Sequence, residues 1–168
     1  MIDMSTKEAG MAQRRRTLPT AEELRTWREF IETFDALRSE LSARLQRDFG
    51  LSAGDYAVLL ALSEADGQRL RPSAIADAIG WERSRLSHHL GRMERRGLVR
   101  REQCPDDNRG AEVVLDAAGR TAFDRAALPH LRDVRALFVD ALTPQQLEAA
   151  GEIAAALRAR VPPRGRGS

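Results

Sequence analysis

The sequence has little of what membrane proteins and secreted proteins require. It contains no run of about 18 to 20 uncharged apolar residues, the length that a membrane-spanning helix needs. The charged N-terminal residues are not followed by the apolar stretch of a secretory signal. We therefore expect a cytoplasmic protein.

Cysteine is also scarce. The single cysteine, Cys104, cannot form a disulfide within the chain, and no spacing of Cys and His suggests zinc. His88 and His89 are neighbours that point about 100° apart on a helix, so they cannot converge on one ion. We expect no metal and no other cofactor. Cys104 has two open interpretations, an ordinary strand residue or a redox-sensing thiol.

Catalytic motifs are missing too. The sequence has no phosphate-binding loop, no nucleophile elbow and no pair of carboxylates with a plausible cleft. Aromatic residues make up only 5% of the chain, against 42% apolar and 31% charged residues. This composition is typical of a soluble, mainly helical protein, and we predict that the protein is not an enzyme.

Arginine is what the sequence has in abundance, and it is unevenly placed. Between Arg69 and Arg109 there are ten arginines and six acidic residues, a local net charge of +4 on a chain of net charge +2. A basic segment on a nearly neutral chain is the electrostatic pattern of a surface that meets polyphosphate.

Capping pairs mark the first two helices. Thr20 and Glu23 form a capping-box pair, which predicts a helix from there to Gly50. Ser52 and Asp55 form a second pair and predict a shorter helix.

The segment from 69 to 115 has the order of elements of a winged helix-turn-helix. Pro72 suits the first turn of a helix that Gly80 ends, and a second helix over 83 to 96 follows. The remaining elements are an exposed link over 69 to 71, strands over 98 to 104 and 111 to 115, and a hairpin tip over 105 to 110 between the strands. The predicted fold class is mainly α with a small antiparallel β-wing.

The C-terminal part is expected to be helical. Asp116 can cap a long helix that reaches Leu142, and Pro129 predicts a kink in it. Thr143 opens a final helix through a capping box with Gln146. The predicted divisions of the chain are a flexible arm over 1 to 17, a helical region over 18 to 50, the winged segment over 51 to 115, a helical region over 116 to 160 and a disordered tail over 161 to 168.

A helical wheel separates two faces of the helix over 83 to 96. Leu86, Leu90 and Met93 form the face that packs on the domain. The opposite arc carries side chains that donate hydrogen bonds, namely Ser84, Arg85, His88, Arg92 and Arg95. Such a helix fits the major groove of DNA, where arginine bonds guanine through two edges and serine or histidine bonds several base edges. The alternative is a merely solvated face, rich in arginine because the genome is rich in GC.

The hairpin tip adds a second candidate contact. Arg109 is flanked by Asp107, so a carboxylate can brace the turn while the guanidinium enters the narrow minor groove. Arg100 and Arg101 on the adjacent strand would lie near backbone phosphates, with an exposed charge as the alternative for each. The whole segment predicts binding to double-stranded DNA. A winged helix used only as a protein-interaction module is the alternative function.

Four stretches of the sequence follow a recognisable pattern. They are LSAGDYAVLLALSEA, RLRPSAIADAIGWERSRLSHHLGRMERRGLVRRE, DNRG and PHLRDVRALFVDALTPQQ. These stretches lie between residues 51 and 146. On them the chain is similar, over about residues 27 to 157, to the MarR (multiple antibiotic resistance regulator) family of bacterial transcription factors.

The resemblance implies a homodimer in which the first helix and the last two helices of each subunit interleave into a dimerisation region. It also implies a repressor that reads DNA with the helix over 83 to 96 and with Arg109, braced by Asp107. A twofold dimer calls for a pseudo-palindromic operator with half-sites about one helical turn apart. One departure is Glu82, which stands where the family commonly has a serine or threonine N-cap.

Many members of the family release DNA when a small aromatic or anionic compound binds. We expect such an effector site where the first helix, the second helix and the kinked helix meet. Its aromatic residues would be Trp27, Phe30, Phe34, Tyr56 and His130. The alternative is a place in the core or the dimer interface, where aromatic residues at helical spacing usually lie.

The N-terminal arm carries consecutive arginines at 14 to 16. We expect them to add non-specific affinity for DNA, since each phosphate that is neutralised steepens the salt dependence of binding.

Overall fold

The computed structural model describes residues 18–104 and 107–161, and it leaves out the side chains of residues 104 and 107–110. The expected arm over 1 to 17 and the tail beyond Val161 lie outside the described residues. The chain forms two compact units, Met1–Ser39 and Glu40–Ser168. Among the described residues, no helix combines the length and the apolar composition that crossing a membrane requires.

The first two helices begin where the capping pairs predict. Helix α2 spans Ala21–Phe49. The Thr20 amide donates to the Glu23 carboxylate (2.6 Å), and the Glu23 amide donates to the Thr20 hydroxyl (3.2 Å). Helix α3 spans Ala53–Glu64 behind the same reciprocal bonds between Ser52 and Asp55. A 3-10 turn, η1, follows at Asp66–Gln68. Both predicted helix starts are confirmed.

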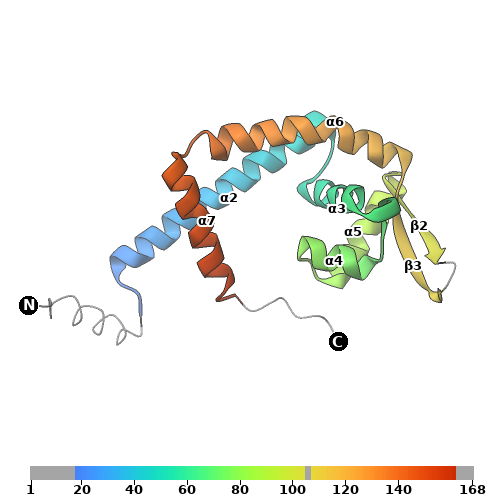
Figure 1. Cartoon of the computed structure of the whole chain (residues 1–168), viewed down its shortest axis with the longest axis horizontal. Helices are drawn as coiled ribbons and strands as arrows, with labels where there is room; N and C mark the ends of the chain where they lie inside the picture. The colour runs from blue at the N-terminus through green and yellow to red at the C-terminus, as the bar shows by residue number, and fades with distance from the viewer. Residues whose placement is uncertain (1–17, 105–106, 162–168) are drawn as a thin grey trace, which may run out of the picture. The chain divides into compact units, whose positions relative to one another are not determined.

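The helix-turn-helix is also confirmed. Helix α4 spans Pro72–Ile79 and helix α5 spans Arg83–Arg95. Gly80 adopts the left-handed conformation (φ 67°), in which its amide bonds back to the end of α4. Figure 1 shows α3, α4 and α5 gathered beside the β2–β3 hairpin, whose strands span Val99–Cys104 and Asp107–Leu115.

The sheet has a strand that the sequence reading missed. Arg69–Leu70 form strand β1, which pairs antiparallel with β3 through Arg69↔Val114 and Leu70↔Val113, giving the order β1-β3-β2. The expected exposed link at 69 to 71 is therefore wrong in its first two residues. Two residues are too few for an alternating pattern, and only the partner strand makes them a strand.

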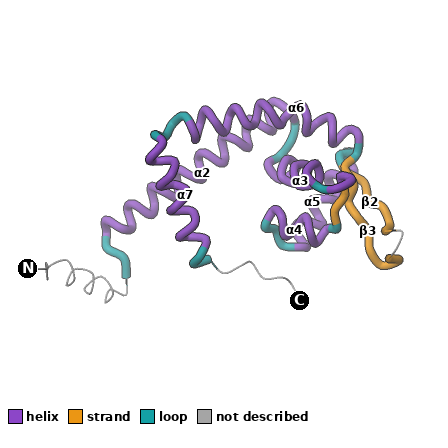
Figure 2. Tube along the Cα trace, viewed as in Figure 1, coloured by secondary structure: helices purple, strands orange, loops and turns teal. Residues whose placement is uncertain are grey.

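The hairpin is longer than predicted. Strand β3 begins at Asp107 rather than at residue 111, and the β2–β3 register shifts between Gln103 and Cys104. Gln103 pairs with Ala111 but Cys104 pairs with Asp107, so extra residues bulge from β3 at this point. The strands, orange in Figure 2, form the antiparallel wing.

One apolar core joins the helix-turn-helix to the sheet. It takes side chains from α3, α4, α5, both long strands and the following helix α6. Its fully or nearly fully buried members include Val58, Leu59, Leu62, Ile75, Leu86, Leu90, Met93, Val99, Val113, Phe123 and Ala126. Because one cluster covers the inner face of α5, the rotation of that helix about its axis is fixed.

The C-terminal region is helical, with one irregularity. Helix α6 spans Ala117–Val134 with Asp116 as its N-cap, and it continues through Pro129. Instead of extending regularly to Leu142, the chain winds into a π-helical turn, η2, at Arg135–Val139. A π-helical turn holds one residue more than an α-helical turn, and the spacing of apolar residues in the sequence does not reveal a single such turn. Helix α7 then spans Pro144–Arg158 behind the predicted Thr143 capping box.

Candidate nucleic-acid interface

The two faces of α5 lie as the helical wheel predicts. Leu86, Leu90 and Met93 are buried at 1% exposure or less. The side chains of the opposite arc are all exposed, namely Ser84, Arg85, His88, Arg92 and Arg95. The structure thus gathers these hydrogen-bond donors on one solvent-facing surface, which we call the reading face.

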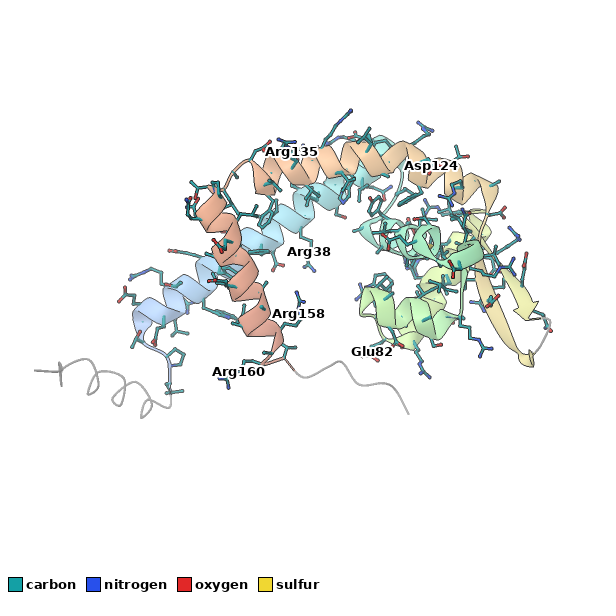
Figure 3. The ribbon with its side chains drawn as sticks, in the orientation of Figure 1. Arg38, Glu82, Asp124, Arg135, Arg158 and Arg160 are labelled. Carbon is teal, nitrogen blue, oxygen red and sulfur yellow. The ribbon has the colours of Figure 1, made fainter. Side chains whose placement is uncertain are left out.

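Glu82 occupies the N-cap of α5 and makes no side-chain capping bond. Its label in Figure 3 marks the turn that leads into α5. The carboxylate still suits this end of the helix, because the helix dipole favours negative charge near its N-terminus. Leu86, on the next turn, donates its amide to the Glu82 carbonyl, so the helix starts here without a serine or threonine cap.

Two arginines of the reading face contact aromatic side chains, one over a ring face and one through a ring nitrogen. The Arg85 guanidinium carbon lies 4.0 Å from the centroid of the Trp81 ring. Arg92 Nη2 lies 2.8 Å from His89 Nδ1. The Trp81 and His89 rings meet edge to face, with centroids 5.1 Å apart.

A cluster of polar contacts around the buried carboxylate of Asp55 was not predicted from the sequence. Asp55 is 2% exposed, and its carboxylate lies 3.0 Å from His89 Nε2 and 2.7 Å from Arg96 Nη1. Arg96 Nη2 also donates to the Gly50 carbonyl (2.7 Å). The sequence identified Asp55 only as a capping residue. The one available signal was the place of His89 at the border of the packed face of α5.

The cluster determines the charge of Asp55. Burial alone would raise the pKa of this carboxyl, but the contacts with His89, Arg96 and Ser52 outweigh burial and hold the pKa well below its ordinary value. Asp55 is therefore ionised at neutral pH, and it ties α3 to the middle of α5 through His89 and to the C-cap of α5 through Arg96.

The arginines of the wing differ in how strongly carboxylates hold them. Arg100 lies 2.7 Å from Glu102 and 3.6 Å from Asp116. Arg101 lies 3.6 Å from Glu94, and both side chains are more than two-fifths exposed, so this pair is weak and a phosphate can replace it. The predicted phosphate contact thus suits Arg101 better than Arg100. The side chains of Asp107 and Arg109 lie outside the described part of the chain.

The predicted effector residues fall into two groups. Tyr56 and His130 lie together, with ring centroids 4.5 Å apart, and Phe123 lies 5.5 Å from Tyr56. Burial lowers the pKa of His130, against the opposing charge of Asp133, and burial raises the pKa of Tyr56. Trp27, Phe30 and Phe34 belong to the other compact unit, where the tilted rings of Phe30 and Phe34 have centroids 4.8 Å apart.

No group of three or more metal-ligating side chains occurs within residues 18–104 and 107–161 as far as their side chains are described. The Cys104 side chain lies outside the described part of the chain, so an ordinary strand residue and a redox-sensing thiol both remain predictions for it.

Comparison with known proteins identifies the family. Residues 49–110 match the family model described as MarR family. The transcriptional regulator HosA of Escherichia coli O111:H- is 34% identical over 108 residues, which cover 64% of this chain and 78% of HosA. The crystal structure of Sco3205, a MarR family regulator from Streptomyces coelicolor in complex with DNA, is 38% identical with a TM-score of 0.83, covering 89% of this chain and 94% of Sco3205.

A more distant structure has the same fold. The organohalide-sensing regulator RdhR-CbdbA1625, in its 2,4-dichlorophenol-bound form, has a TM-score of 0.74 at 18% identity, with 88% of each chain covered. Sequence and fold agree, and the chain belongs to the MarR family of DNA-binding transcriptional regulators.

Proposed function

We propose that the protein is a homodimeric repressor that reads a pseudo-palindromic operator with the reading face of α5 and releases it when a small effector binds. The observation that carries the proposal is the exposed arc of hydrogen-bond donors directly opposite the buried Leu86, Leu90 and Met93. Because the inner face fixes the rotation of α5, the same side chains always face outward, as reading base edges requires.

The distribution of exposed apolar side chains favours this function over a protein-interaction module. Among the described residues between 40 and 127, no large apolar side chain is exposed. The winged segment therefore offers a polar, arginine-rich surface, which suits a polyphosphate partner. A protein-interaction surface would carry apolar or aromatic anchors at its centre.

Single alanine substitutions on the reading face test the proposal. We expect Arg92→Ala and Arg95→Ala each to weaken operator binding by about 1 to 3 kcal/mol, roughly 5- to 150-fold in Kd. The same loss is expected for Arg109→Ala if that residue enters the minor groove. The measurement is fluorescence anisotropy at fixed salt, on a duplex that the wild-type protein selects from a random-sequence library.

The matched control is Arg125→Ala, which removes an exposed arginine from α6 outside the basic segment. It should bind within about twofold of wild type. If the reading-face variants bind as tightly as this control, the α5 surface does not read DNA and the protein-interaction module becomes the better function.

We also propose that a phenolic effector binds beside Tyr56 and His130. His130 Nδ1 is buried and has no hydrogen-bond partner among the described residues, so a polar group is called for next to it. Because burial lowers the pKa of His130, the ring is neutral at pH 7 and suits a phenol hydroxyl better than a carboxylate. Binding of 2,4-dichlorophenol by the RdhR regulator, which has the same fold, supports the choice of phenols.

A thermal-shift comparison tests the effector site. At ten times its Kd, a phenol should stabilise the protein by about 1.4 kcal/mol, which raises Tm by roughly 3 to 6 °C. Toluene derivatives of the same shape, which lack the hydroxyl, and benzoates should give smaller shifts, and His130→Leu should abolish the preference for the hydroxyl. Equal shifts for phenols and toluenes, or none with any compound, would rule out this site.

A further inference from the structure

Two aromatic rings, those of Trp81 and His89, contact two of the arginines of the reading face. Trp81 supports the Arg85 guanidinium at 4.0 Å, a distance at which a cation is attracted to the ring face. His89 Nδ1 lies 2.8 Å from Arg92 Nη2. Each of these two exposed arginines therefore has a defined resting place within its own protomer.

The Arg92 contact fixes the tautomer of His89. A guanidinium only donates hydrogen bonds, so Nδ1 must be the unprotonated, accepting nitrogen. The ring proton then sits on Nε2, the nitrogen that lies 3.0 Å from Asp55 Oδ1. His89 thus accepts from a residue of the reading face with one nitrogen and faces a buried carboxylate with the other.

The two rings are themselves held in place by the start of α3. His89 is 6% exposed and meets the Trp81 ring edge to face. Gly54 makes room for both, because a Cβ at this position would lie 2.6 Å from Trp81 Cη2 and 3.0 Å from His89 Cε1. Arg96 and Ser52 bond the same Asp55 carboxylate, so the support beneath His89 is rigid.

We propose that Trp81 and His89 are positioning residues that set the base preference of α5 by holding Arg85 and Arg92 in place before DNA arrives. The inference rests on the proposed function of the reading face. A free arginine samples many rotamers, and ordering it on binding opposes association. Contacts with base edges need one geometry, whereas contacts with phosphates tolerate several. Losing the support should therefore reduce specificity more than overall DNA affinity.

Two substitutions at His89 separate positioning from stability. In His89→Asn the amide oxygen can take the place of Nδ1 and accept from Arg92, while the contact with Asp55 is lost. In His89→Gln the amide nitrogen can take the place of Nε2 and keep the contact with Asp55, while Arg92 loses its acceptor. A role in stability alone predicts that His89→Gln is the milder change.

The measured quantity is the ratio of Kd for a scrambled duplex to Kd for the duplex selected by the wild-type protein, at fixed salt. We expect His89→Gln to lower this ratio by about 3- to 10-fold with little change in Kd for the scrambled duplex. His89→Asn should keep the ratio within about twofold of wild type even if its Tm is lower. The proposal would be overturned if His89→Asn had the lower ratio of the two variants, or if both variants had the same ratio.

Two further comparisons complete the test. In an Arg92→Ala background, His89→Gln should change the ratio no further, because the supported side chain is gone. Trp81→Phe keeps an aromatic platform for Arg85 and should preserve the ratio, whereas Trp81→Leu should lower it.

If Arg92→Ala itself leaves the ratio unchanged, the reading face fails as a DNA site. If Arg92→Ala lowers the ratio but both His89 variants match wild type, only the positioning role fails.

Discussion

We expect Ile153→Glu to convert the protein from a dimer to a monomer. Exposed large apolar side chains are confined to both ends of the described chain, on α2, α6, η2, α7 and the residues that flank them. On α7 they are Leu147, Ile153 and Leu157, at 37 to 52% exposure. Such a set of apolar side chains is typical of a surface that a second copy covers.

The substitution acts at the interface rather than in the protomer. Ile153 is 45% exposed in the single chain, so a glutamate there remains solvated in the monomer. In a dimer the carboxylate would be buried without a partner, which costs about 3 kcal/mol or more, roughly a hundredfold or more in the dimer Kd. Operator affinity should also fall, because two linked half-site contacts bind more tightly than one.

Light scattering coupled to size-exclusion chromatography measures the outcome. The measured molar mass should be twice the 18.7 kDa chain mass for wild type and equal to the chain mass for Ile153→Glu. Thr121→Glu, which places the same charge on an exposed position of α6, is the control and should remain dimeric. A monomeric wild-type protein would contradict the proposed dimer, and a dimeric Ile153→Glu would place the interface away from α7.

Among the glycines that the structure describes, Gly119 should tolerate alanine least. Gly119 is buried in the first turn of α6, and a Cβ there would overlap the Leu98 carbonyl oxygen and lie 2.9 Å from the carbonyl carbon. The obstacle is backbone, and the same oxygen accepts the Asp116 amide (3.2 Å), so it cannot move without loosening the start of α6. We expect a loss of about 3 kcal/mol or more in the free energy of unfolding.

Gly91→Ala provides a control of opposite sign. Gly91 lies inside α5, where the nearest atom to a new Cβ is the flexible end of Arg95 at 3.8 Å. Alanine should therefore stabilise the helix by about 0.5 to 1 kcal/mol. Thermal and denaturant unfolding at one protein concentration should show a Tm about 6 to 12 °C lower for Gly119→Ala. A Tm for Gly119→Ala within a degree or two of wild type would mean that α6 does not start against Leu98.

Features encoded within one or two helical turns were predicted correctly. The capping boxes at Thr20, Ser52 and Thr143 join residues three apart, so they can be seen in the sequence. The burial of Leu86, Leu90 and Met93 follows from helical spacing alone. The same spacing defines the reading face, whose contacts with DNA remain predictions.

Most of the errors and omissions involve partners far apart in the chain, and the π-turn η2 is the exception. Strand β1 exists because β3, more than forty residues later, offers it hydrogen bonds. The extra residue of η2 depends on local winding that apolar spacing does not record. The contact between Asp55 and His89 joins α3 to α5, and local spacing does not indicate that the two residues meet.

The sequence by itself determined where the helices begin, the order of the helices and the wing hairpin, and which face of α5 is buried, because all of these depend on near neighbours and on periodicity. Only the tertiary structure decided what stands behind the reading face. There the bare backbone of Gly54 admits Trp81 and His89, and the buried carboxylate of Asp55 faces the ring that supports Arg92. Such contacts arise when distant segments pack together, and they define where the Arg85 and Arg92 side chains lie in the single chain.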